Sequence, residues 1–345
     1  MNMRIYKYIG LLVLFFLFSC QFSKQKDAVL ECSLQHKVLL NDDFVIGKVR
    51  SMTLTSDSVP VVVDIQSEHV FQVLDYKKQN IRNYGHRGQG PDDFLFPTAL
   101  SVWKNDTMGC WDINKRRYSA MQLLPEDSLV QFCRLFDTHD SLLHYEIFPV
   151  CNEQFIAVGI YNDYRLVTLD KKGHFVKGFG VSPYRNDEEF KISGTIRSEV
   201  YQGGLAVNPS GTWLVHALLR ANILSFYDIQ PNGDLSLVTE QVGSYPDYDY
   251  NTGAMALSAP IYYLDVYATE RYAYLLYSGK NYKEDKDKAF VGNIIEVYDR
   301  EGHHVRNLSL DIDIQVMCVS PNDSKVYAIA FQLNPILVSF DMNFP

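Results

Sequence analysis

The sequence repeats one pattern six times: an apolar strand, a polar turn, a second strand, a short turn, a third strand often ending in Asp, and a fourth strand. Two clear copies are "GGLAVNPSGTWLVHALL" and "IQVMCVSPNDSKVYAIAF", each with a proline-containing tight turn between its first two strands. The first turns are marked by Asp57, Asn105, Asn152, Ser210, Thr269 and Asn322, in steps of 48, 47, 58, 59 and 53 residues. The third strands are expected to end near Asp75, Leu123, Asp170, Asp228, Asp299 and Asp341.

Units of four short strands are typical of propeller blades, because each blade buries its faces only against its neighbours. A β-sandwich would also have many short strands, but not six copies of one four-strand unit. No alternation of strands and helices indicates a parallel sheet. The sequence therefore predicts an all-β, six-bladed β-propeller over residues 37–345, with four antiparallel strands per blade.

The sixth copy lacks a fourth strand, since the chain stops soon after "PILVSFDM". A strand-like segment without a blade, "HKVLLNDDFVIG", lies at residues 36–47. We expect Val38–Leu40 or Phe44–Ile46 to pair with 335–341, which would complete the last blade and remove an exposed edge.

The N-terminus reads as an export signal. Arg4 and Lys7 precede an apolar run too short to span a bilayer comfortably, and the run ends in Leu-Phe-Ser-Cys at residues 17–20. This end resembles a bacterial lipobox, which predicts a lipoprotein signal peptide at 1–19, palmitate-type acylation of Cys20 and a tether over 20–36. An ordinary signal peptide with a chance cysteine is the alternative. Gln21 is not the aspartate that retains such lipoproteins at the inner membrane, so an outer-membrane lipoprotein on an undetermined side is expected.

The charge of the mature chain argues against a nucleic-acid partner. Without residues 1–19 it carries 30 basic and 41 acidic residues, a net charge near −11. Nucleic acid and anionic lipid both attract basic surfaces, so membrane attachment is expected through the lipid alone. The other cysteines have scattered spacings without CxxC, which disfavours a metal knuckle and selects no disulfide: Cys32, Cys110, Cys133, Cys151 and Cys318.

The long connections of this pattern all belong to one face. In a propeller, the fourth-to-first and second-to-third connections open at the same end, and here these include residues 85–97, 180–203, 243–260 and 279–292. Loops on a rigid scaffold commonly carry function. Their polar and aromatic residues form the candidate binding face: Arg87, Asp92, Asp93, Tyr184, Arg185, Tyr245, Tyr248, Tyr250 and Tyr282. Tyrosines beside carboxylates can hold a carbohydrate or a protein, or they can simply pack the loops onto the ring.

No catalytic, cofactor or metal motif is evident. The glycines of "GHRGQGPDDF" fit neither GxGxxG nor a P-loop, and the histidines form neither HxH nor HExxH. The acids and histidines are also expected to occupy no repeated inner-strand position. An enzyme, in the form of a metal-dependent lactonase or lyase at the channel mouth, is kept as the alternative to a binding or scaffolding module.

The lipobox, the six repeats, the "NPSG" and "SPND" turns and the "GxxGxGPxxF" segment (Gly85, Gly88, Gly90, Pro91 and Phe94) together resemble the TolB-like six-bladed propeller lipoproteins of Gram-negative bacteria. The resemblance covers residues 37–345 and the signal. Family members commonly carry an acidic residue before the phenylalanine, and Asp93 matches it in charge. The resemblance implies a fold and a location in the cell envelope, and leaves the ligand open.

Overall fold

The computed structural model describes residues 29–104, 107–123 and 130–342. The predicted signal peptide, Cys20 and the turn marker Asn105 lie outside the described residues. Residues 31–345 form one compact unit. No described helix is long and apolar enough to cross a membrane.

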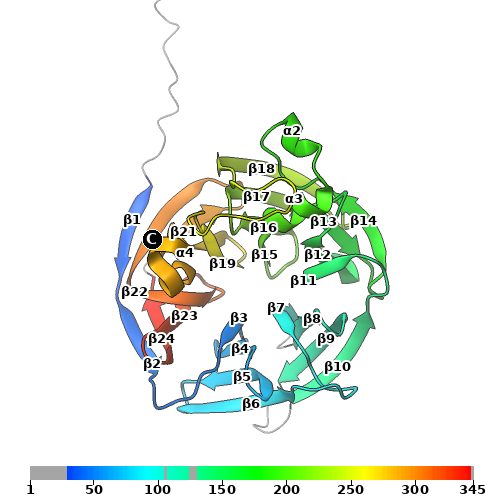
Figure 1. Ribbon diagram of the computed structural model, residues 1–345. Helices are drawn as coiled ribbons and strands as arrows, with labels where there is room; N and C mark the ends of the chain where they lie inside the picture. The colour runs from blue at the N-terminus through cyan, green and yellow to red at the C-terminus, as the bar shows by residue number, and fades with distance from the viewer. Residues whose placement is uncertain (1–28, 105–106, 124–129, 343–345) are drawn as a thin grey trace, which may run out of the picture. The chain divides into compact units, whose positions relative to one another are not determined.

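The unit is an all-β propeller, whose antiparallel sheets stand around a common centre (Figure 1). Four sheets have four strands each. The first sheet contains β3 (Val49–Leu54), β4 (Pro60–Asp64), β5 (His69–Asp75) and β6 (Asn80–His86). The second contains β7 (Pro97–Lys104), β8 (Thr107–Asp112), β9 (Arg117–Leu123) and β10 (Val130–Asp137). The third contains β11 (Leu143–Val150), β12 (Gln154–Ile160), β13 (Leu166–Leu169) and β14 (Phe175–Phe179). The fourth contains β15 (Gly203–Val207), β16 (Trp213–Leu218), β17 (Asn222–Ile229) and β18 (Leu235–Ser244).

The fifth sheet is larger, because one long strand belongs to two groups. Its strands are β19 (Tyr263–Ala268), β20 (Tyr272–Tyr277), β21 (Gly292–Asp299), β22 (His304–Val319), β23 (Lys325–Phe331), β24 (Pro335–Asp341) and β2 (His36–Leu40). Residues 304–309 of β22 pair with β21 and residues 316–319 pair with β23, whereas Ile314 between them pairs with both. β1 (Leu30–Leu34), which lies within the segment expected to be the tether, pairs with β22 outside this strand order.

Two predictions about strands are confirmed in detail. Val38 pairs with Val338 and Leu40 with Leu337, as expected for an N-terminal strand beside 335–341. The third strands end within one residue of the predicted positions, at Asp75, Leu123, Leu169, Ile229, Asp299 and Asp341.

The innermost strands contact one another in a cycle: β3, β7, β11, β15, β19, the second part of β22, and β3 again. Apolar residues between neighbouring sheets supply the core; one cluster joins Val62 of β4 to Ile329 of β23 and Leu40 of β2. Such burial is the main favourable contribution to folding. Because side chains from adjacent sheets fill these interfaces, the ring rigidly positions the loops at its ends.

Candidate functional site

The four long loops lie at the end of the ring where the inner strands begin. Two of them contain short helices, which are α2 (Asp187–Phe190) and α3 (Gly194–Val200) between β14 and β15, and α4 (Tyr282–Asp285) with the 3-10 helix η2 (Lys286–Phe290) between β20 and β21. Contacts connect three of the loops: Arg185 bonds to the carbonyl of Pro246, and the Lys283 N–H donates to Leu257 O at 2.9 Å. We call this end of the ring the long-loop face.

Arg87 holds the fourth long loop, residues 85–97, against the neighbouring β4–β5 turn. Its guanidinium donates to the carbonyl oxygens of Ser67 at 2.9 Å, Asp64 at 2.7 Å and Leu95 at 2.6 Å. The planar guanidinium fork suits several acceptors at once. Arg87 is therefore occupied by the protein backbone and has a structural role in this connector.

Asp93 explains the glycines that precede it. Its carboxylate accepts the Gly90 N–H at 2.7 Å and lies 3.2 Å from His86 Nδ1. A Cβ at Gly88 or Gly90 would lie 2.4 or 2.7 Å from Asp93 Oδ2, closer than non-bonded atoms approach. The Gly90 hydrogen bond, followed by His86 and Lys115, lowers the pKa of Asp93. Asp92 is exposed.

Phe94 secures the same loop between two sheets. It is buried, with its ring centroid 5.0 Å from that of Phe71 on β5 and 5.2 Å from that of Phe132 on β10. Phe94 therefore anchors the loop between the two sheets, whereas Phe96 lines the central cavity. The "GxxGxGPxxF" segment is thus a folded connector built around Arg87, Asp93 and Phe94.

A fully buried carboxylate organises the largest loop. Glu189 of α2 accepts the Tyr201 hydroxyl at 2.9 Å and the backbone N–H of Arg185. Asn186 caps α2 by accepting from the N–H groups of Glu188 and Glu189. Tyr184, which is 40% exposed, packs on Phe190. Tyr184 and Phe190, which is 48% exposed, together offer accessible aromatic surface.

The tyrosines of loop 243–260 mainly pack the loop onto the ring. Tyr248 is 9% exposed within a cluster that includes Val200, and the partly buried Tyr245 and Tyr250 pack against that cluster. Tyr282 instead packs on Phe290, 6.1 Å between ring centroids. The packing alternative thus accounts for Tyr248, and ligand contact by the other tyrosines stays a prediction.

A cavity of about 470 Å³ lies at the centre of the ring and is lined from all six inner strands. This volume falls within the range usual for small-molecule sites. Its ionisable lining groups, tyrosines apart, are Arg50 on β3, Glu146 on β11 and Asp265 on β19. Arg50 is the second residue of β3, whereas Glu146 and Asp265 lie nearer the middle of β11 and β19.

The three charges form an unequal group. Arg50 Nη2 lies 3.7 Å from Glu146 Oε1, and the side chains of Arg50 and Glu146 are 48% and 14% exposed. Burial raises the pKa of Glu146, opposed by Arg50 and by the Leu205 N–H. Burial raises the pKa of Asp265 to about 7, opposed by the N–H groups of Met317 and Val266 and reinforced by Glu146.

Two of these carboxylates hold a repeated structural position. Ser51, Glu146 and Asp265 each follow a register irregularity near the start of an inner strand. Each accepts a backbone N–H from the next inner strand, at 3.1 Å from Leu100, 3.3 Å from Leu205 and 2.8 Å from Met317.

The expectation that the acids occupy no repeated inner-strand position is therefore wrong. The repeat falls on every second strand, and it combines a serine with a glutamate and an aspartate. A search for one residue type in all six copies could not find it. The repeat could have been found by looking for a hydrogen-bond acceptor at the bulge position of every second inner strand, with a small or apolar residue at that position in the strands between.

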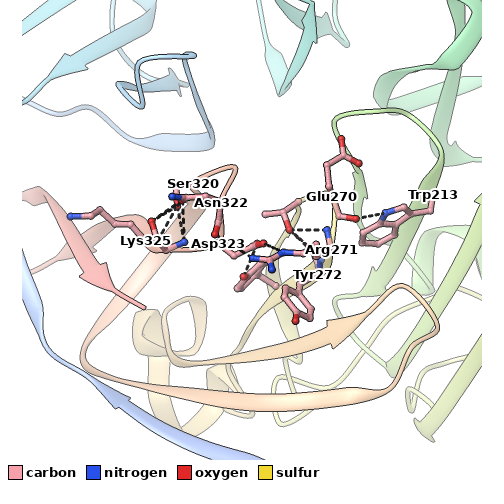
Figure 2. A network of polar contacts seen from close by, with 11 residues as sticks. Trp213, Glu270, Arg271, Tyr272, Ser320, Asn322, Asp323 and Lys325 are labelled. Atoms are coloured by element: carbon pink, nitrogen blue, oxygen red, sulfur yellow. Dashed lines mark hydrogen bonds and ion pairs between the residues drawn. The ribbon is translucent and has the colours of Figure 1, made fainter. Parts of the chain in front are cut away.

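The turns at the opposite end of the ring connect one sheet to the next, as Figure 2 shows for part of this network. Arg271 Nε donates to Asp323 Oδ2 at 2.8 Å, and Trp213 Nε1 donates to Glu270 O at 3.4 Å. Within its own turn, Ser320 accepts the Lys325 N–H at 2.9 Å. The "SPND" turn thus contacts the β19–β20 turn of the same large sheet, whereas Asn208 of the "NPSG" turn bonds to Glu270 and joins the fourth sheet to the fifth. We therefore place the candidate site at the long-loop face.

The described residues contain no group of three or more His, Cys, Asp or Glu side chains that could hold a metal ion. A metal-dependent lactonase or lyase stays a prediction. The five cysteines after Cys20 are free, with Cys110 and Cys318 buried and Cys133 exposed.

Comparison with known proteins agrees with this architecture. The chain matches the TolB-like 6-blade propeller-like family over residues 31–322 and belongs to that family. No curated protein sequence matches it.

Solved structures show the same fold at low sequence identity. A calcium-binding protein, regucalcin, from Agrobacterium tumefaciens str. C58 is 10% identical, with a TM-score of 0.55 over 92% of this chain and 98% of that one. A luciferin-regenerating enzyme is 9% identical, with a TM-score of 0.53 over 90% and 96%.

Proposed function

We propose that the ring is a six-bladed propeller closed by the N-terminal strand. The eight-stranded sheet then comprises two blades that share β22, and β2 is the fourth strand of the last. The division of β22 between β21 and β23, the pairing of β2 with β24 and the cyclic contacts of the inner strands support this interpretation.

We further propose that the protein is a binding module of the cell envelope, with its ligand site at the long-loop face. One observation carries the proposal: the cavity of about 470 Å³ at the centre of the ring is lined by three charged side chains together with Phe96 and Gln202 from two of the long loops. Glu146 and Asp265 would fix the polar part of a ligand, and exposed loop residues such as Tyr184 and Asp92 would contact it or its carrier.

A crosslinking pull-down from membranes tests this function. We expect the wild-type chain to capture an envelope component, and Tyr184→Ala, Asp92→Ala and Glu146→Gln each to reduce its yield. Lys172→Ala is the matched control, because Lys172 is exposed in the turn between β13 and β14, away from the candidate site. Capture that is unchanged in all three variants, or reduced equally in the control, contradicts the proposed site.

The anchor is proposed separately. Acylation of Cys20 would hold the module stably, since several acyl chains bind a bilayer far more tightly than one, and Gln21 favours the outer membrane. Radiolabelled palmitate should enter the wild-type chain and not Cys20→Ala. Label that persists in the variant refutes the assignment of Cys20.

A further inference from the structure

The charged side chains that line the central cavity carry one more negative than positive charge when all are ionised. Besides tyrosines, its ionisable groups are one guanidinium, Arg50, and two carboxylates, Glu146 and Asp265. Arg50 lies beside Glu146 at 3.7 Å, whereas Asp265 has backbone N–H partners. A carboxylate in a poorly hydrated site needs a counter-charge or a proton.

We propose that the cavity binds a small organic molecule through a protonated primary amine, which Glu146 and Asp265 receive together. This inference deepens the proposed function and rests on it. An ammonium group supplies one positive charge and three donors, and would leave the site electrically neutral. Tyr145, Phe148 and Phe96 in the lining offer apolar and aromatic surface for the rest of the molecule.

The charge pattern disfavours a divalent cation as the occupant. A divalent cation would leave the site with a net charge of +1. It would also be repelled by the guanidinium of Arg50, which lies beside Glu146. Calcium also takes six to eight oxygen ligands, whereas only two carboxylates among the described residues line this cavity, and each already accepts a backbone N–H, from Leu205 or from Met317. An organic cation needs fewer ligands and fits the donor set better.

The groups that face Asp265 predict how the affinity changes with pH. They are Arg50 from β3, Glu146 from β11, Tyr267 on the same strand and Cys318 from β22. Burial raises the pKa of Asp265 to about 7, so a proton competes with the amine in acid. Amine affinity should therefore rise about tenfold between pH 6 and pH 8 and level off above that range.

Calorimetric titration of the purified chain lacking residues 1–19, with Cys20→Ser, tests the proposal directly. The probes are butylamine, benzylamine and phenethylamine, each compared with the alcohol of the same carbon skeleton, and calcium chloride. We expect at least one amine to bind tenfold or more tightly than its alcohol, with proton release near pH 7. Equal binding of the pair, or binding of calcium but no amine, overturns the proposal.

Variants separate the contributions of the three charges. Asp265→Asn should weaken amine binding at least tenfold and remove its pH dependence, and Glu146→Gln should also weaken it. Arg50→Gln should strengthen it, because a repelling charge is gone. Asp163→Asn, an exposed carboxamide substitution between β12 and β13, is the control expected to have no effect.

Thermal unfolding of each variant checks that it is folded, and weaker binding in a folded Arg50→Gln overturns the charge argument. If the envelope component is still captured while no amine binds, the proposed function stands and this inference fails.

Discussion

At the scale of single residues, the carboxylate of Asp93 explains why glycines recur in the segment 85–94. Asp93 fills the space beside Gly88 and Gly90, and its hydrogen bond to the Gly90 N–H fixes the turn. The acidic character at this position therefore serves the loop itself. Glycine is required here for close approach to a neighbour, in addition to any conformational freedom.

Gly88→Ala should destabilise the protein by about 1 to 2 kcal/mol, because the new methyl group would displace the Asp93 carboxylate from its hydrogen bond. In an Asp93→Ala background the same substitution should cost less. Urea unfolding of the two single variants and the double variant measures this coupling. Additive free energies would show that the collision with Asp93 is not the cause.

Asp265 should make stability depend on pH. Its pKa is about 7 in the folded chain, against about 4 when exposed. As the pH rises, the unfolded chain therefore loses this proton at a lower pH than the folded chain does. The contribution of Asp265 to the free energy of unfolding is fully present below about pH 4 and is lost as the pH rises through about 7.

Asp265→Asn keeps a carbonyl acceptor for the Met317 N–H and removes this titration. Its stability relative to wild type should rise between pH 4 and pH 8 by on the order of 4 kcal/mol. Denaturant unfolding at several pH values checks this, and a constant difference between the two proteins would contradict it.

At the scale of elements, long connectors are held by side chains that bond to backbone. Arg87 bonds to three carbonyl groups around the β4–β5 turn, and Asn186 caps α2. Such contacts let irregular segments bury polar backbone without a strand partner. They also give structural roles to residues whose chemistry alone suggests ligand binding.

Arg87→Lys should destabilise the protein by about 1 to 3 kcal/mol, since one ammonium group cannot reproduce the fork that reaches Asp64, Ser67 and Leu95. Arg300→Lys is the matched control, because Arg300 forms an exposed ion pair with Asp228 and such pairs contribute little. Chemical unfolding compares them, and an equal effect of the two substitutions would argue against the backbone role of Arg87.

The sequence allowed elements to be predicted better than the site. Turn residues and terminal aspartates recur at regular spacing, so strand ends such as Asp75 and Asp299 could be located. The cavity charges could not, because Glu146 and Asp265 become equivalent only through bulges that shift the strand register. The buried state of Glu189 likewise depends on tertiary packing around Tyr201.

At the scale of the whole molecule, the two ends of the described chain meet. β2 pairs with β24, and β1 pairs with β22. In an antiparallel pair, residues alternate between those that exchange hydrogen bonds and those that do not. The His36 N–H donates to Asp311 Oδ1 at 3.0 Å, away from β24, so the next residue, Lys37, directs its N–H toward its partner Ser339.

Lys37→Pro should therefore break the pairing that joins the ends of the ring, because proline has no N–H to donate. If β2 closes the propeller, its detachment exposes the edge of strand β24 and the buried side chains of Ile329 and Leu337, against which Leu40 packs. We expect a fall of several degrees in the unfolding temperature of the entire domain in calorimetry, with a single transition. Lys37→Ala is the control, since it removes only the exposed ion pair with Asp341. A second, separate transition in Lys37→Pro, or a Tm equal to that of Lys37→Ala, would mean that the ring holds together without this strand.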